Sequence, residues 1–287
     1  MTTSSHLAAQ PADVSKRSAA HPHLVMTRHG RGAPLVLLHA LGSSSHVWDR
    51  VIPTLADHFE VLSVDLPGFG SSPPLAPAVV PTPALIAAAV AAALDESDIR
   101  SPHVVGNSLG GWVALELAQL RPLASLTLLA PAGLWRGSTP IYDRVSLRAT
   151  RAITRRMPRL LNRLVDHRLG RMILLGQSHG RPALMNPNEA RAAIQAMGTC
   201  SGFDATLAGT THRHYATPIP AGLAVTVAFG SRDRILLRRQ SRHVERLPRT
   251  TIVKTLPGCG HIPMYDDPAA VAALIMASAA RGSRSAS

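Results

Sequence analysis

The sequence has only two cysteines, few aromatic residues and no long apolar run. Cys200 and Cys259 are too few for a disulfide framework and lack the spacing of metal ligands, which indicates reduced thiols buried as small side chains. No run of roughly 18 apolar residues occurs, so a membrane-spanning helix is not expected. Residues 1–22 lack the continuous apolar segment of a secretory signal. These absences predict a cytoplasmic protein with a disordered tail over residues 1–22.

Aromatic residues make up 3% of the chain, and no nucleic-acid recognition motif occurs in it. Proteins bind single-stranded nucleic acids largely by stacking bases on aromatic rings, so nucleic acid is not an expected partner. The net charge is nevertheless +13, and arginine carries almost all of it. The position of these arginines in the chain therefore matters more than their total charge.

Apolar runs that predict buried strands alternate with helical segments along much of the chain. A chain of 287 residues is long enough for one α/β domain with an insertion. The alternation predicts βαβ units, in which a mostly parallel sheet carries helices on both faces. The expected strands are 33–39, 60–65, 103–105, 125–130, 223–230 and 251–256.

The alternation stops after residue 134, because no strand pattern occurs from 135 to 217. We expect an inserted helical cap over 135–217, between two parts of the core at 23–134 and 218–280. A helix over roughly 237–247 is expected between the last two strands. A last helix from Pro268 to about Ala280 is expected to precede a disordered tail at 281–287.

A single serine lies where a predicted strand turns into a predicted helix. Gly106 and Gly110 flank Ser108 at a distance of two residues on each side. A serine in such a tight turn has strained dihedral angles, so the flanking positions must lack side chains for the turn to close. The turn exposes the Ser108 hydroxyl as a nucleophile and leaves the Leu109 N–H at a helix N-terminus, where it favours a developing oxyanion.

Two further side chains that acyl transfer needs follow later strands. Asp233 comes after the strand that ends near Gly230, and His261 after the strand that ends at Leu256. Ligands of an open parallel sheet bind beyond the carboxyl ends of its strands, so these side chains are expected to meet Ser108 there. A nucleophile, a base and a carboxylate that orients the base together form a catalytic triad.

The chain resembles the α/β-hydrolase superfamily over about residues 23–280. The order of Ser108, Asp233 and His261 along the chain is that of this superfamily. The matching motifs are Leu37-Leu38-His39-Ala40-Leu41-Gly42, Asp65-Leu66-Pro67-Gly68-Phe69-Gly70, Gly106-Asn107-Ser108-Leu109-Gly110-Gly111, Phe229-Gly230-Ser231-Arg232-Asp233 and Gly258-Cys259-Gly260-His261.

The resemblance implies the α/β-hydrolase fold and a role for each site residue. Ser108 would be the nucleophile, His261 the general base and then acid, and Asp233 the orienting carboxylate. The backbone N–H groups of Leu41 and Leu109 would form the oxyanion hole, with no cofactor or metal. Ala40 replaces the glycine usual after the loop histidine, which is tolerable unless that site needs a positive φ.

Two other polar residues near the motifs are expected to have structural roles. The ring of His39 would support the oxyanion loop rather than take part in catalysis. Asp65 directly follows a predicted strand and is expected to fix the Pro67–Gly68 turn by local hydrogen bonds.

The predicted cap is strongly basic. Between Arg136 and Arg181 lie eleven arginines, no lysine and two acids, Asp143 and Asp166, a net charge of +9. Six of the arginines recur at helical spacing, which predicts a solvated stripe on one side of a helix. The opposite side is apolar and is expected to cover the site. Pro158 is expected to divide this helix. The stripe is Arg144, Arg148, Arg151, Arg155, Arg159 and Arg163, and the apolar face is Ile153, Met157, Leu160, Leu161 and Leu164. Attraction of anionic substrates and weak contact with an anionic membrane surface are the alternative roles of this charge.

These features favour a serine hydrolase that cleaves a carboxylic ester or related acyl bond of a small-molecule substrate. Hydrolytic cleavage of C–C bonds in ketonic acids fits the same residues, as does perhydrolysis. A non-catalytic module that binds a small ligand or lipid is the alternative from a different class. Epoxide hydrolysis and dehalogenation are disfavoured, because those branches of the superfamily carry aspartate at the position of Ser108.

Overall fold

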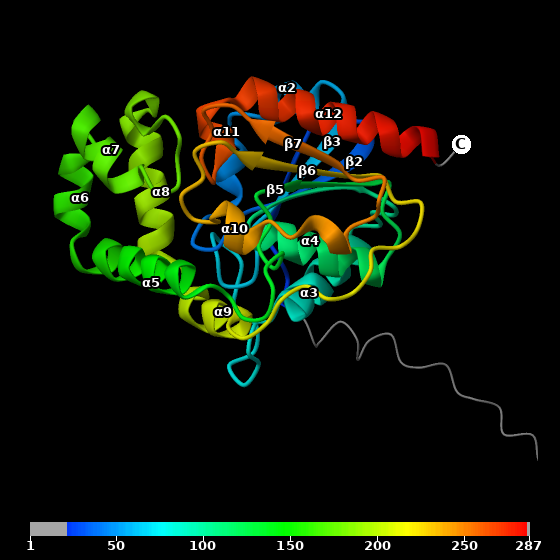
Figure 1. Ribbon diagram of the computed structural model, residues 1–287, viewed down its shortest axis with the longest axis horizontal. Coiled ribbons are helices and arrows are strands. Elements are labelled where there is room, and N and C mark those ends of the chain that lie inside the picture. The colour runs from blue at the N-terminus through cyan, green and yellow to red at the C-terminus, as the bar shows by residue number, and fades with distance from the viewer. Residues whose placement is uncertain (1–21, 286–287) are drawn as a thin grey trace, which may run out of the picture.

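The computed structural model describes residues 22–285 and contains a seven-stranded sheet (Figure 1). The strands are β1 (Met26–His29), β2 (Ala33–Leu38), β3 (Phe59–Val64), β4 (His103–Asn107), β5 (Ser125–Leu129), β6 (Val225–Gly230) and β7 (Ile252–Leu256). Their order across the sheet is β1-β3-β2-β4-β5-β6-β7, in which β1 pairs antiparallel with β3 and every other pair is parallel. The predicted mostly parallel α/β sheet is confirmed.

Helices cover both faces of the sheet (Figure 1). The side chains of β2 divide between the two faces. Val36 and Leu38 pack in a cluster with residues of α3 (Pro83–Glu96) and α4 (Leu109–Leu120). Leu35 and Leu37 pack in a second cluster, with residues of the 3-10 helix η1 (Ser45–Trp48), α2 (Ile52–Ala56) and α12 (Pro268–Ser285). All four β2 side chains are fully buried, which explains why this strand is a continuous apolar run.

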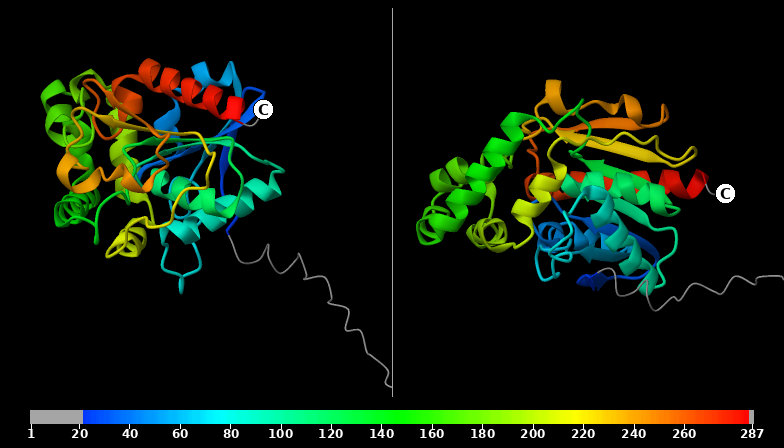
Figure 2. Two further views of the ribbon diagram at one scale, coloured as in Figure 1. Left: turned by 45° about the vertical axis from the view of Figure 1, so that its right-hand side comes forward. Right: turned by 90° about the horizontal axis from the view of Figure 1, so that it is seen from below.

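The chain between β5 and β6 forms helices that lie beyond one end of the sheet (Figures 1 and 2). We call residues 135–217 the inserted segment. Its helices are α5 (Ile141–Arg156), α6 (Pro158–Leu164), α7 (Arg168–Leu175), the 3-10 helix η2 (Pro182–Leu184), α8 (Pro187–Thr199) and α9 (Phe203–Thr210). In Figure 1 the arrowheads of β6 and β7 point toward this segment. Its helices therefore stand over the carboxyl ends of the strands.

The two ends of the inserted segment are bound to each other. The Tyr215 N–H donates to the Gly133 carbonyl oxygen at 2.9 Å. The Trp135 indole donates to the Arg213 carbonyl oxygen at 2.7 Å. The chain thus enters and leaves the inserted segment at one place.

The predicted arginine stripe is not a single solvated face. Pro158 divides the helix as predicted, since α5 ends at Arg156 and α6 begins at Pro158. Arg151, however, is only 7% exposed. It donates to the main-chain oxygens of Met197 and Cys200, the latter at 2.6 Å. Its guanidinium group also lies over the Phe203 ring. This arginine joins α5 to the end of α8.

The predicted apolar face of the same helix is correct only in part. Leu161 is buried, whereas Met157, Leu160 and Leu164 are each more than one third exposed. The break at Pro158 changes the direction of the chain, so residues on its two sides do not share one face.

The C-terminal helix is longer than predicted, and a predicted helix before β7 is broken. Helix α12 continues to Ser285, so the disordered tail expected from residue 281 is wrong for 281–285. Gly282 packs closely on the Ala124 carbonyl oxygen, and Arg281 donates to Thr226 Oγ1 at 3.1 Å, which holds this end against the sheet. The helix expected over 237–247 is divided into α10 (Arg238–Ser241) and the 3-10 helix η3 (Val244–Arg246).

Several other expectations concern the ends of the chain and the cysteines. The tail predicted over residues 1–22 falls outside the described residues, apart from Pro22, as do residues 286–287 of the other tail. Within residues 22–285 no helix is long and apolar enough to cross a membrane. Cys200 and Cys259 are free and buried, as predicted.

Candidate active site

Ser108 occupies a strained turn between β4 and α4. Its φ of 54° and ψ of −113° lie outside the regions that side chains favour, which typically costs about 1–3 kcal/mol. A Cβ on Gly106 would lie 2.2 Å from the Gly110 carbonyl oxygen, and one on Gly110 would lie 2.2 Å from that of Leu38. The predicted need for both glycines is therefore confirmed.

Asp233 and His261 meet where β6 and β7 end. The His261 ring nitrogen Nδ1 and the Asp233 oxygen Oδ2 are 3.0 Å apart, and both side chains are buried. The other carboxyl oxygen, Oδ1, accepts hydrogen bonds from the N–H groups of Ile235 and Leu236 at 2.9 and 3.0 Å. Burial alone would raise the pKa of Asp233, but His261 and the two N–H groups together hold it below its ordinary value. The carboxylate therefore stays charged and favours a proton on Nδ1 of the ring.

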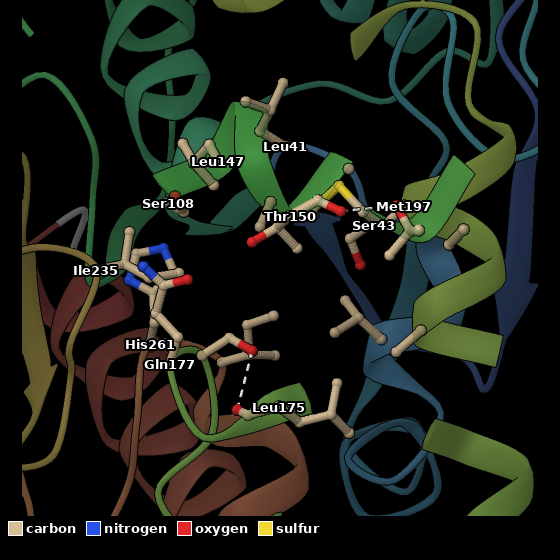
Figure 3. A pocket seen from close by; sticks show the side chains of 18 of the residues that line it. Leu41, Ser43, Ser108, Leu147, Thr150, Leu175, Gln177, Met197, Ile235 and His261 are labelled. Atoms are coloured by element: carbon tan, nitrogen blue, oxygen red, sulfur yellow. Dashed lines mark hydrogen bonds between the residues drawn. The ribbon is translucent and has the colours of Figure 1, made fainter. Parts of the chain in front are cut away.

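Ser108 and His261 line the same cavity (Figure 3). Its volume is about 620 Å³, and the loop after β2, the turn at Ser108 and the inserted segment enclose it. No hydrogen bond joins the Ser108 hydroxyl to the His261 ring within the described part of the chain. Catalytic hydrogen bonds are often long before substrate binds, so this geometry is compatible with proton transfer between the two.

The asparagine before the serine ties the turn to the histidine loop. The Asn107 side-chain amide donates to the carbonyl oxygens of His261 and Leu129, each at 2.9 Å. Sequence reasoning did not find this role, because the two groups are 154 positions apart in the chain. The contact fixes the backbone of His261 relative to Ser108.

Leu41 and Leu109 are the two residues predicted to supply the N–H groups of the oxyanion hole. Both residues line the cavity, and neither N–H donates a hydrogen bond to any other described residue. Ala40 does not have a positive φ, whereas Gly42 in the same loop has a φ of 74°. The replacement of the usual glycine by Ala40 is therefore accommodated without backbone strain.

His39 makes structural hydrogen bonds, as predicted, whereas only one of the two hydrogen bonds of Asp65 is of the local kind predicted for the Pro67–Gly68 turn. The Nε2 atom of His39 accepts from the Leu66 N–H at 3.0 Å, which leaves Nδ1 to donate to the Ala40 carbonyl oxygen at 2.8 Å. Burial lowers the pKa of His39, so the ring is neutral. The Asp65 carboxylate accepts from the N–H groups of Ser45 and Ser71 at 2.7 and 2.8 Å, and thus joins the loop after β3 to η1.

Asp143 is a cavity residue that sequence reasoning missed. It lies in the first turn of α5, lines the cavity and is 2% exposed. Burial raises its pKa to about 7, with a smaller lowering by His261 and a smaller raising by Asp233. The only available signal was that Asp143 is one of two acids among eleven arginines.

The arginines of the inserted segment do not reach the described cavity wall. No arginine or lysine is among the described residues that line the cavity, and Asp143 provides its only carboxyl group. Most lining side chains from α5, α7 and α8 are apolar, including Leu147, Ile173 and Ile194. Across residues 22–285, no cluster of three His, Cys, Asp or Glu side chains could hold a metal ion.

Comparison with known proteins identifies the family. A sequence model described as the alpha/beta hydrolase family matches residues 35–274. The chain belongs to the alpha/beta hydrolase family. This match covers every motif quoted above, from the loop at His39 to His261.

Within this family, the chain is similar to esterases. It is 44% identical over 108 residues to a pimeloyl-[acyl-carrier protein] methyl ester esterase of Methylococcus capsulatus, a match that covers 37% of this chain and only 40% of that relative. An esterase from Thermogutta terrifontis has the same fold, with a TM-score of 0.72 and 21% identity over 90% of this chain and 93% of that one. A meta-cleavage product hydrolase from Pseudomonas fluorescens also has this fold, with a TM-score of 0.68 and 17% identity over 89% and 93% of the two chains.

Proposed function

We propose that this alpha/beta hydrolase cleaves carboxylic esters through a triad of Ser108, His261 and Asp233. The observation that carries the proposal is the 3.0 Å contact of His261 with Asp233 at the wall of a cavity that also contains Ser108. The esterases among its relatives support the choice of an ester bond.

The proposed reaction begins with attack on the ester carbonyl carbon by the Ser108 hydroxyl oxygen. His261 takes the hydroxyl proton on Nε2, while Asp233 stabilises the imidazolium through Nδ1. The negative oxygen of the tetrahedral intermediate accepts hydrogen bonds from the Leu41 and Leu109 N–H groups, each worth about 3 kcal/mol. His261 then returns the proton to the leaving alcohol as the C–O bond breaks.

Water completes the cycle by hydrolysing the acyl group on Ser108. His261 removes a proton from this water, which attacks the acyl carbon and forms a second tetrahedral intermediate. Collapse of that intermediate releases the acid and restores the Ser108 hydroxyl with the proton from His261. The inserted segment acts as a cap that keeps the bound ester in the largely apolar cavity.

The cavity favours an ester over a ketonic acid as substrate. C–C bond hydrolysis of a ketonic acid would bring a carboxylate into the cavity, where no arginine or lysine lines the described wall to pair with it. The Asp143 carboxyl group would repel that carboxylate whenever it is ionised. The exposed arginines of the inserted segment lie outside the cavity and do not relieve this repulsion.

Labelling with a fluorophosphonate probe tests the proposal. The probe should modify Ser108 in the folded wild-type protein, and Ser108→Ala should remove the label. Absence of labelling in folded protein would support a non-catalytic binding module instead. Short p-nitrophenyl esters should be turned over faster than a vinylogous diketo acid, and the opposite order would indicate C–C bond hydrolysis.

A further inference from the structure

Asp143 is a buried carboxyl group without a partner inside the cavity. Neither of its carboxyl oxygens has a hydrogen-bond partner among the described residues. The other polar groups that α5 brings to the cavity differ in this respect, because Thr150 donates to the Ser146 carbonyl oxygen and Thr154 to that of Thr150. A buried carboxyl group without a partner is destabilising, so its presence requires an explanation.

Stabilisation of the α5 N-terminus does not explain this side chain. A carboxylate three positions after the N-cap typically accepts a hydrogen bond from the N-cap N–H. Here the N-cap is Pro140, which has no N–H to donate, and no side-chain capping bond forms. No arginine, lysine or histidine forms a salt bridge with Asp143 in the described region. The carboxyl group is therefore available to a molecule in the cavity.

The surroundings of Asp143 restrict what that molecule carries. A cationic group would have to pass a segment with eleven arginines and two acids, and would lose its hydration among apolar side chains. A carboxylate would be repelled by Asp143 and by Asp233, whose charge acts on the same carboxyl group. A neutral hydrogen-bond donor of an ester fits, and a hydroxyl group is the simplest such donor.

We propose that Asp143 is a substrate-binding residue, whose carboxyl group accepts a hydrogen bond from a hydroxyl group that the ester carries apart from its scissile bond. The proposal rests on the esterase function proposed above and defines the substrate class as hydroxylated esters. It gives α5 a role in specificity, since this helix brings to the substrate the only carboxyl group among the described residues of the cavity wall.

Matched pairs of esters test the proposal. Methyl esters of alkanoic acids are compared with the same esters carrying a hydroxyl group at successive chain positions, and ethyl esters are compared with 2-hydroxyethyl esters. Above about pH 8, where Asp143 with its pKa of about 7 is ionised, the wild type should prefer the hydroxylated ester of at least one pair in kcat/KM by about 10- to 100-fold, the range for a hydrogen bond to a charged group. If that pair differs in the acyl portion, Asp143 binds a hydroxyl group on the acyl side of the ester. If it differs in the alcohol portion, the hydroxyl group lies on the alcohol side.

Variants of Asp143 should change this preference specifically. Asp143→Leu removes the acceptor and should bring the ratio of kcat/KM values to about 1, whereas Asp143→Asn keeps an acceptor oxygen and should retain part of it. Asp204→Leu is the matched control, because Asp204 is an exposed carboxylate on α9 of the same segment, with 67% of its side chain accessible. This control should keep the wild-type ratio.

Failure of this proposal can be separated from failure of the proposed function. Two results overturn the role of Asp143, provided that Ser108 still reacts with the fluorophosphonate probe. One is a wild type without preference for any hydroxylated ester, and the other is an unchanged ratio of kcat/KM values in Asp143→Leu. The carboxyl group would then hold only water. If folded wild type neither reacts with the probe nor hydrolyses any ester, the proposed function itself is wrong. Asp143→Asn keeps the size of the side chain, so it serves if Asp143→Leu does not fold: its ratio should lie between 1 and the wild-type value, and an unchanged ratio overturns the role of Asp143.

Discussion

Replacement of Asp233 by asparagine should inactivate the protein through the orientation of a single amide. The oxygen Oδ1 of Asp233 accepts from two backbone N–H groups, at 2.9 and 3.0 Å. In Asp233→Asn the amide oxygen must stay at this position, because an NH₂ group there would face two donors. The NH₂ group then points at Nδ1 of His261, where the carboxylate oxygen Oδ2 was.

This orientation forces the wrong tautomer on the histidine. Nδ1 must accept from the amide, so the ring proton moves to Nε2, and Nε2 cannot take the proton of Ser108. The expected loss in kcat is about 10⁴-fold, as when the same exchange is made in other serine hydrolases. This loss corresponds to about 5 kcal/mol of transition-state stabilisation.

The assay compares kcat for a p-nitrophenyl ester and the rate of fluorophosphonate labelling in the wild type, Asp233→Asn and Asp204→Asn. Asp204 is an exposed carboxylate distant in sequence from Ser108, Asp233 and His261, and its variant should behave like the wild type. Circular dichroism and thermal unfolding verify that each variant is folded. If folded Asp233→Asn loses less than about 10-fold in kcat, the reasoning from the two N–H donors is refuted.

Three further predictions concern pH, backbone strain and salt. The raised pKa of Asp143, about 7, means that the folded protein keeps a proton that the unfolded chain releases above about pH 4. The free energy of unfolding of the wild type should therefore fall between about pH 4 and 7, by up to about 4 kcal/mol relative to Asp143→Asn. Urea unfolding measures this, and the absence of such a trend would contradict the burial of this carboxyl group. Ser108→Gly should be more stable than Ser108→Ala by about 1 kcal/mol in the same assay, because glycine adopts a φ of 54° without strain, and equal stability would show an unstrained turn. Raising the ionic strength should lower kcat/KM for an anionic ester but not for a neutral ester of the same size. The reason is that the arginines attract anions from outside the cavity, and salt screens this attraction. Equal responses of the two esters would exclude an attraction of anionic substrates by the arginines.

The sequence predicted the parts of the molecule that depend on local patterns. Buried strands such as β2 are continuous apolar runs because both faces of the sheet are covered, and the turn at Ser108 needs glycines at fixed positions. The contact between Asp233 and His261 followed from a topological rule, which brings residues after parallel strands to one edge of the sheet.

The remainder depended on contacts between segments distant in the chain. Arg151 belongs to a helical stripe of arginines, and only the position of α8 determines that it is buried against Met197 and Cys200. The role of Asp143 was missed for the same reason, because nothing near it in the sequence indicates that α5 turns it toward the cavity. Helix α12 extends past residue 280 because Gly282 packs against Ala124, a contact that helix propensity does not encode.

The pairing of Gly133 with Tyr215, and of Trp135 with Arg213, has a consequence for how such proteins diversify. Because the strand-to-strand connection leaves and rejoins the sheet at a single point, recombination can exchange the helices between these anchors for others of different length. Ser108, Asp233 and His261 stay in place during such an exchange, since all three lie outside the exchanged segment. New substrate preferences can then arise without the chemistry having to be rebuilt.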